Sequence, residues 1–362
     1  MKKLLRKFSS LYTPERNSEF SCLQTAHLNF FDSVLPSSSI VTKDLDKYNT
    51  DYIGTFKGES NLVLMPFNTE QVQAIVKYCN QENLPLSLQS GNTGLVGGSV
   101  PVHDEVILNL SNLKNILDFF PHEGLVKCEA GVILEKLNKY CEERGYLVPL
   151  DLGAKGSCMV GGNIATNAGG NRLIRYGSLH NSVVGLEVVT GTGEVFSSLS
   201  RTGHTGFDLG QVFIGSEGTL GIITKAALKL SLKPLAVNAA LLGCSSFSEV
   251  LKTLKLARNY LGEVLSAFEF LDSQAFNLSK SCLPKYKDIG FSKSYKFYVL
   301  VETSGSNYDH DYCKFEKFLE TALESSVEDG ILASDIKQLN ALWTIRENCG
   351  PAAARAGHVF FS

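Results

Sequence analysis

The sequence predicts an α+β fold built in two successive parts. From Leu62 onward strands and helices alternate, and glycine is dense from Asp151 to Gly185. After Pro234 glycine becomes sparse, and further strands separated by amphipathic helices follow. We therefore expect a domain boundary near Pro234, because a chain of 362 residues is long enough for two domains.

Strands and helices are expected to alternate in the first part. Asn68, followed by Gln71 at the capping-box position, predicts the start of a helix whose apolar face recurs at helical spacing. Residues 151–185 are predicted as loops and turns. Strands are predicted at 62–65, 84–88, 106–110, 125–129 and 221–232, a second helix at 132–144, and a hairpin of 183–190 and 194–197 that turns at 191–193.

In the second part, strands separated by packed helices predict a sheet with helices on one face. The strands are expected at 237–242, 264–271 and 297–302, and the helices at 247–261 and 312–323. The first of these helices should bury the residues that recur on one of its faces, namely Phe247, Val250, Leu251, Leu254 and Ala257.

Composition excludes several classes of protein. The net charge is -3 and 20% of residues are charged, so the chain has no basic excess for nucleic acid. No apolar run approaches the roughly 20 residues that a membrane-spanning helix needs. Nine scattered cysteines without a CxxC pair predict reduced thiols in a reducing compartment. Seven dispersed histidines show no metal-binding spacing.

The first residues have a different character. Four basic residues precede the first acid, Glu15, and apolar residues recur among them at helical spacing. This composition is typical of a mitochondrial targeting helix, and a disordered basic tail is the alternative. We expect a targeting segment over residues 1–22.

The first chemical signal is a glycine-rich loop at Ser90–Gly98, placed after a predicted strand. Closely spaced glycines let backbone N–H groups converge on phosphate oxygens and leave room for a pyrophosphate. The loop lacks the Gly-Lys-Ser/Thr of a P-loop and does not open a helix as GxGxxG does. Taken alone, it is equally compatible with a turn that binds nothing.

Two further segments of the same kind follow, at 150–170 and at Gly215–Ile222. The glycine content of these three segments is well above the ordinary frequency of about 7%. A long ligand with two phosphates, approached by backbone from several sides, explains them better than scattered turns do.

These segments resemble the flavin-binding domain of the vanillyl-alcohol-oxidase or PCMH-type family, and most closely its D-2-hydroxyglutarate dehydrogenases. The resemblance runs from about Leu23 to about Val359 and rests on GNTGLVGGSVPV, PLDLGAKGSC, GGNIATNAGG, YGSLH, FIGSEGTLGIITK, LSAFEFLD and ETSGSN. It implies a helical lead-in at 23–56, a two-subdomain FAD-binding domain at 57–234, and a ferredoxin-like α/β cap for the substrate at 235–362 whose C-terminal part is absent.

The resemblance also implies a cofactor site. FAD would be bound without a covalent link, since the first loop contains neither His nor Cys. The first loop would hold the pyrophosphate, the second segment would line the other side of the flavin, and the third would lie near the adenine and ribose. The residues implied are Ser90, Gly91, Asn92, Thr93, Gly94, Gly97, Gly98, Ser99, Gly156, Ser157, Gly161, Gly162, Asn163, Gly221 and Ile222.

The implied activity is oxidation of D-2-hydroxyglutarate to 2-oxoglutarate, by hydride transfer from C2 to flavin N5. Arg346, in the segment Trp343–Glu347, would clamp the substrate carboxylate, because a guanidinium pairs bidentately with a carboxylate. Electrons would pass to an electron-transfer flavoprotein in the mitochondrial matrix. Family members carry a zinc-type metal site and a histidine base in a later stretch, which this sequence does not contain. Ser90, Asn171, His204, Gly350 and the segment 358–362 depart from the family pattern.

Two alternatives remain from the residues alone. Without the metal ligands and the base, the chain could be a flavin-binding protein that does not turn over. Alternatively, the substrate could be another 2-hydroxy acid, such as D-lactate or glycolate. On the residues alone, an arginine such as Arg346 is more often a solvated helix residue, since charged side chains are mostly exposed.

Overall fold

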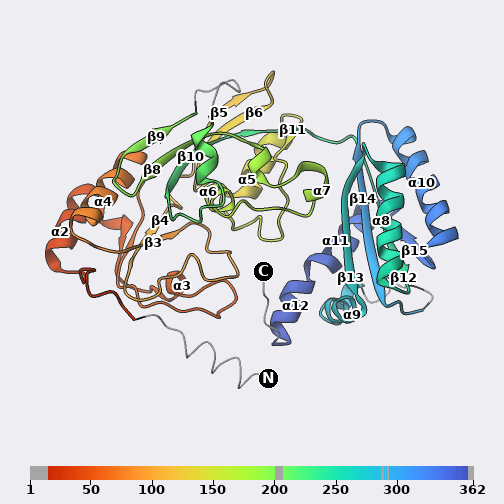
Figure 1. Ribbon diagram of the computed structural model, residues 1–362, viewed down its shortest axis with the longest axis horizontal. Helices are drawn as coiled ribbons and strands as arrows, with labels where there is room; N and C mark the ends of the chain where they lie inside the picture. The colour runs from red at the N-terminus through yellow and green to blue at the C-terminus, as the bar shows by residue number, and fades with distance from the viewer. Residues whose placement is uncertain (1–14, 200–206, 287–288, 290, 292, 358–362) are drawn as a thin grey trace.

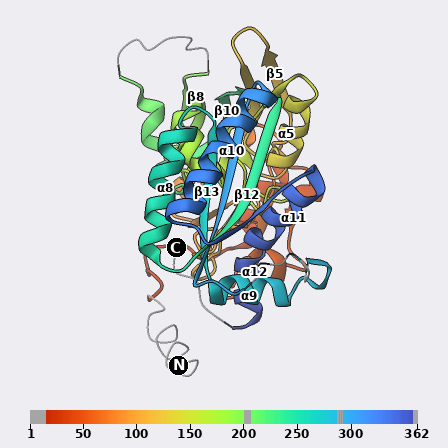
Figure 2. The ribbon, with the colours of Figure 1, turned by 90° about the vertical axis from the view of Figure 1, so that its right-hand side faces the viewer.

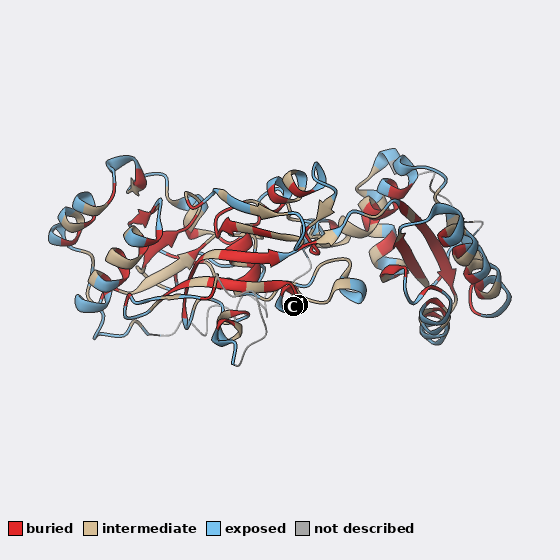
Figure 3. Cartoon of the chain, turned by 90° about the horizontal axis from the view of Figure 1, so that it is seen from above, coloured by how far each residue is buried: buried red, intermediate tan, exposed pale blue. Residues whose placement is uncertain are grey.

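The computed structural model describes residues 15–199, 207–286, 289, 291 and 293–357, and it separates into two parts joined near residue 235 (Figure 1). Buried residues gather in the interior of each part (Figure 3). The expected targeting helix, His204 and the segment 358–362 lie outside the described residues. No helix in the described ranges is long and apolar enough to cross a membrane.

The first part begins with a small sheet in the order β1-β2-β4-β3, in which β2, β3 and β4 run parallel and β1 is antiparallel. Helices α2 and α4 lie beside each other next to this sheet, on the left of Figure 1. The elements are α2 (Thr25–Val34), a 3-10 turn (Ser37–Ser39), β1 (Ile40–Val41), α3 (Asp46–Asn49), β2 (Val63–Leu64), α4 (Thr69–Gln81), β3 (Leu86–Gln89) and β4 (Val106–Asn109).

A larger antiparallel sheet follows, in the order β5-β6-β10-β8-β9. A two-stranded sheet of β7 and β11 lies at the end of this part. The elements are β5 (Ile116–Phe120), β6 (Leu125–Glu129), α5 (Leu134–Glu142), β7 (Tyr146–Leu147), α6 (Val160–Ala165), α7 (Leu173–Tyr176), a 3-10 turn (Leu179–Asn181), β8 (Val183–Thr190), β9 (Val195–Ser197), a 3-10 turn (Leu209–Phe213), β10 (Gly221–Lys229) and β11 (Ser231–Leu232).

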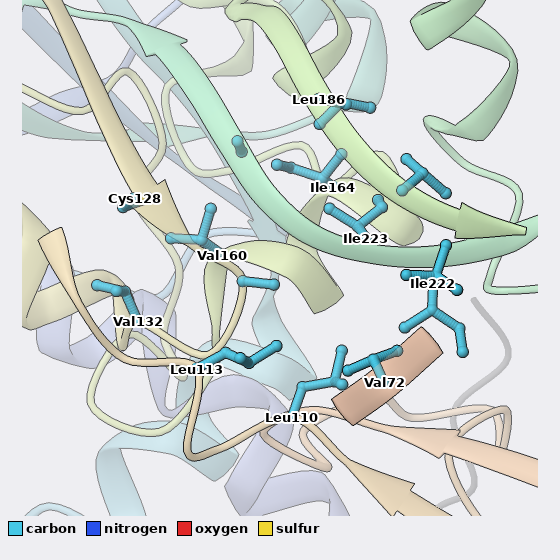
Figure 4. Close-up of a cluster of buried hydrophobic side chains, with 14 of the residues drawn as sticks. Val72, Leu110, Leu113, Cys128, Val132, Val160, Ile164, Leu186, Ile222 and Ile223 are labelled. Atoms are coloured by element: carbon cyan, nitrogen blue, oxygen red, sulfur yellow. The ribbon is translucent and has the colours of Figure 1, made fainter. Parts of the chain in front are cut away.

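The two sheets of the first part share one hydrophobic core. Figure 4 shows Val160 and Ile164 of α6 within this core, together with Ile222 and Ile223 of β10. Leu110, which directly follows β4, belongs to the same cluster. Helix α6 is therefore fixed against β10 at the place where the two sheets meet.

The second part is an antiparallel sheet in the order β13-β14-β12-β15. Helices α8 and α10 cover one face, while α9 and α11 pack on the other (Figure 2). The elements are β12 (Ala236–Cys244), α8 (Phe247–Leu261), β13 (Leu265–Asp272), α9 (Ser273–Ser281), a 3-10 turn (Pro284–Tyr286), β14 (Phe297–Gly305), α10 (Tyr308–Ser325), β15 (Asp329–Leu332), α11 (Ile336–Glu347) and α12 (Cys349–Arg355).

Most predicted elements are present, and local signals explain why. Helix α4 begins after Asn68, whose Oδ1 accepts the Gln71 N–H at 2.9 Å. Helix α8 begins with a reciprocal capping box between Ser246 and Glu249. The hairpin of β8 and β9 turns where expected, and Gly193 there has a φ of 78° that favours glycine.

Three expectations were wrong. The sheet of the second part carries helices on both faces, because α9 and α11 bury a second apolar cluster against it. Helices α6 and α7 form within the segment predicted as loops and turns. Helix α8 buries Val250 and Ala257 as expected, together with Thr253 and Leu261, but Phe247 and Leu251 of the expected face are exposed. The sheet selects that face, and periodicity alone could not fix the rotation of the helix.

Candidate functional site

The loop after β3 is held in shape by amide side chains. Gln89, 2% exposed, donates from Nε2 to the carbonyls of Tyr48 and Ser99, both at 2.9 Å, so it joins the two ends of the loop. Within the loop, Asn92 adopts a positive φ of 49°, and its Oδ1 accepts the Ser99 hydroxyl at 2.7 Å. The loop is therefore preorganised before any ligand arrives.

The second and third glycine-rich segments contact each other. The Gly215 and Glu217 N–H groups donate to the carbonyls of Ile164 and Ala165, at 3.1 and 2.8 Å. The first loop contacts the second segment at Gly91, where a Cβ would lie 2.3 Å from the Ser157 carbonyl oxygen. The fold thus brings together three segments that are far apart in the sequence.

These segments surround one cavity of about 350 Å³ between the two sheets of the first part. Twelve of the fifteen cofactor residues expected from the sequence line it: Ser90, Gly91, Asn92, Thr93, Gly94, Gly98, Ser99, Gly161, Gly162, Asn163, Gly221 and Ile222. A second hollow of about 230 Å³ shares Leu88, Gly218, Gly221 and Ile222 with this cavity. The two hollows therefore adjoin each other along these residues.

Gly97, Gly156 and Ser157 are expected cofactor residues that do not line the cavity. Gly97 packs on Phe56 and has a φ of 77°, a backbone conformation that favours glycine, so this residue is needed for the turn of the loop. A Cβ at Gly156 would lie 3.5 Å from Glu135 Oε2, and Ser157 contacts Gly91 through its carbonyl. These three residues support the walls of the cavity.

Several lining residues were not expected from the sequence. Some are apolar residues without a distinguishing motif, and others flank a glycine that was noticed. Only the position of each backbone segment in the fold identifies them. They are Leu88, Gln89, Val96, Leu110, Leu152, Gly153, Ala154, Cys158, Met159, Ala165, Thr166, Ala168, Glu217, Gly218 and Ile223.

The glycines of these segments differ in what an added Cβ would meet. At Gly91, Gly161 and Gly218 a Cβ would lie within 3.0 Å of other protein atoms, so these glycines permit close backbone packing. At Gly94 and Gly153, which both line the cavity, a Cβ would meet no described atom within 4 Å. Gly94 and Gly153 therefore leave a surface free of side chains for a ligand.

The polar groups of the cavity fit a nucleotide cofactor. The buried Oδ1 atom of Asn163 has no hydrogen-bond partner among the described residues, although buried amide oxygens are normally paired. Among the described lining residues, only Cys158 and Glu217 are ionisable. Burial raises the pKa of the Cys158 thiol, so this sulfur stays protonated at neutral pH. Within the described residues, no three His, Cys, Asp or Glu side chains gather as a metal site.

Arg346 does not line this cavity. It lies in the last turn of α11, where its Nε and Nη2 atoms contact Glu269 Oε2 of β13 at 2.7 and 2.6 Å. The next residue, Glu347, accepts a hydrogen bond from Asn171 of the first part at 3.2 Å. Arg346 is therefore held close to the junction of the two parts.

Comparisons with known proteins agree with this arrangement. Residues 60–198 match the family model of an FAD binding domain, and residues 233–362 match the C-terminal domain of FAD linked oxidases. A mitochondrial D-2-hydroxyglutarate dehydrogenase of Danio rerio is 48% identical over 94% of this chain and 64% of its own length. A D-2-hydroxyglutarate–pyruvate transhydrogenase of Saccharomyces cerevisiae is 40% identical over 96% of this chain and 71% of its own length.

The chain belongs to the FAD-linked oxidoreductase family of the D-2-hydroxyglutarate dehydrogenases. It spans less than two thirds of the length of the Danio rerio family member. The solved structure of p-cresol methylhydroxylase shares the fold, with a TM-score of 0.72 over 92% of this chain and 72% of that chain, at 16% identity. The expected PCMH-type fold is therefore confirmed, as is the FAD-binding domain of this family.

The thiols of this family member provide a first prediction. None of the nine cysteines is in a disulfide, and Cys22 and Cys313 are exposed. Burial raises the pKa of Cys79, Cys128 and Cys141 to about 12 and that of Cys244 to about 11. Because the thiolate is the reactive form, a thiol reagent near pH 8 should label Cys22 and Cys313 first and leave these four unlabelled.

Mass spectrometry of labelled peptides measures the order in which the cysteines react. In denaturant all nine cysteines should react, which is the control. Rapid labelling of Cys128 in the native protein would contradict the buried position of that thiol.

Proposed function

We propose that the cavity between the two sheets binds FAD without a covalent link, and that the protein oxidises D-2-hydroxyglutarate to 2-oxoglutarate. The observation that carries the proposal is the set of three backbone segments that converge on one cavity, with Gly94 and Gly153 among the residues that line it. The family relationship supports the same cofactor. Bound FAD would supply the acceptor, at N5, for the hydride that leaves C2 of the substrate.

In this proposal the first loop holds the pyrophosphate with its backbone N–H groups. The loop contains no Lys or Arg, so oriented amide dipoles would neutralise the phosphate charge. Gly221 and Ile222, which line both hollows, would lie beside the adenosine half. Cys158 would lie beside the cofactor as a protonated thiol, which is consistent with a non-covalent site.

The second part, which we place at residues 235–362, would act as the substrate cap. Arg346 would bind a carboxylate of the substrate. Its Nε and Nη2 atoms pair with Glu269 Oε2, which leaves the Nη1 donors for the ligand. Glu269 would thus hold the guanidinium in one orientation. We further propose that the protein acts in the mitochondrial matrix and passes electrons to an electron-transfer flavoprotein.

Anaerobic titration tests this function. The purified protein should be yellow, and D-2-hydroxyglutarate should bleach the visible flavin band while the L enantiomer should not. A yellow protein that no 2-hydroxy acid bleaches would overturn the activity and leave only flavin binding. Bleaching by D-lactate or glycolate, without bleaching by D-2-hydroxyglutarate, would overturn the proposed substrate.

A further inference from the structure

One ionic cluster crosses the junction between the two parts of the molecule. It contains Arg172 and Asp151 from the first part and Glu302 from the second. We propose that Arg172 and Glu302 form an interdomain latch that positions Arg346 relative to the cofactor cavity. This inference rests on the proposed function, because Arg346 receives its role there.

Glu302 is the centre of the latch on the cap side. It lies in β14, is fully buried, and accepts hydrogen bonds from Arg172 Nε at 2.9 Å and Nη2 at 3.3 Å. Ser266 Oγ and Trp343 Nε1 donate to the same carboxylate at 2.8 and 2.7 Å. A buried carboxylate is tolerated only when it is paired and hydrogen-bonded in this way.

Arg172 connects that carboxylate to the wall of the cavity. Its remaining nitrogen, Nη1, contacts Asp151 Oδ2 at 2.9 Å, and Lys155 Nζ contacts the other oxygen of Asp151 at 3.2 Å. Asp151 directly precedes Leu152, Gly153 and Ala154, which line the cavity. A single planar guanidinium therefore binds the cavity wall and the cap at once, in a geometry that an ammonium cannot reproduce.

The latch reaches Arg346 from both sides along α11. Trp343 lies three residues before Arg346, on the adjacent turn, and is tied to Arg172 through Glu302. Glu347 follows Arg346 and is tied to Asn171, the neighbour of Arg172. Two adjacent residues of the first part thus fix the segment that carries Arg346. A purely structural pair would have no need to bracket this particular residue.

Two variants remove the latch in different ways. Arg172→Lys keeps the positive charge and loses the fork of the guanidinium. Glu302→Gln keeps the size of the side chain and one acceptor oxygen, but it replaces the other oxygen with an amide nitrogen and loses the negative charge. Both should retain FAD, while kcat/KM for D-2-hydroxyglutarate falls roughly 10- to 100-fold, because a small displacement of a binding group is costly. Glu187→Gln is the matched control. Glu187 pairs with Lys225, Thr69 and Thr224 within the first part, so this change should lower stability alone.

The chain provides a second readout that does not depend on activity. Trp343 is its only tryptophan, is 7% exposed, and has its ring centroid 6.0 Å from the Arg172 guanidinium. In the FAD-loaded protein, acrylamide should quench Trp343 fluorescence more strongly in Arg172→Lys and Glu302→Gln than in wild type or Glu187→Gln.

The two readouts separate the possible failures. Unchanged kcat/KM in an Arg172→Lys protein that also shows wild-type quenching would overturn the latch. If no 2-hydroxy acid reduces the wild-type flavin, the proposed function fails, while quenching still tests the latch. If Glu302→Gln does not fold, Arg172→Lys decides, because Arg172 is partly exposed and lysine preserves its charge.

Discussion

Replacing Gly94 by valine should abolish FAD binding and leave the fold intact. Gly94 lines the cavity, its φ lies outside the left-handed region, and a Cβ there would meet no described atom within 4 Å. The valine would therefore project into the space assigned to the cofactor and keep phosphate from the loop amides. Losing two charge-assisted hydrogen bonds, at about 1.5–3 kcal/mol each, weakens binding about a hundredfold or more.

The flavin-to-protein ratio after purification and FAD titration of the apoprotein measure this effect. Thermal unfolding of the apoprotein should be nearly unchanged, which separates the effect from misfolding. Gly350→Val is the matched control, since a Cβ at Gly350 also meets no described atom within 4 Å and Gly350 does not line the cavity. A Gly94→Val protein with one FAD per chain would refute the assignment of the loop.

Replacing Arg346 by alanine should raise KM for D-2-hydroxyglutarate about thirtyfold while the protein keeps its flavin. Truncating one member of a charged pair costs about 2–5 kcal/mol, and the lower end applies because the Arg346 side chain is 37% exposed. Part of the loss of substrate affinity would come from Glu269. This residue would remain near the ligand as an unpaired carboxylate and would repel the two carboxylates of D-2-hydroxyglutarate.

A double-mutant cycle separates these two contributions. In Arg346→Ala/Glu269→Gln, KM should recover partly toward the wild-type value, because the repelling charge is gone. Arg346→Lys should give an intermediate KM, since an ammonium lacks the fork. Loss of FAD from Arg346→Ala would contradict the placement of this residue in the cap, and an unchanged KM would exclude it as the carboxylate clamp.

Local signals explain where sequence-based prediction of this fold succeeded. The start of α4 depends on Asn68 and Gln71, which are neighbours along the chain. The rotation of α8 depends instead on the sheet beneath it, so Val250 and Ala257 of the expected face are buried whereas Phe247 and Leu251 are exposed. The helix α6 within the glycine-rich stretch was missed because its stability comes from packing against β10, and glycine lowers local helix propensity.

The amino-acid sequence by itself determined that three glycine-rich segments exist and that several local elements begin at particular residues. Only the tertiary structure decided at which glycines a Cβ would meet other atoms and at which the space beside the backbone is open. Gly91 and Gly94 lie in one loop, yet the Ser157 carbonyl abuts the first and open space adjoins the second. The same holds for Arg172 and Glu302, which are 130 residues apart and meet only because two folded parts dock. Neighbours brought from distant positions decide these roles, and no local pattern encodes them.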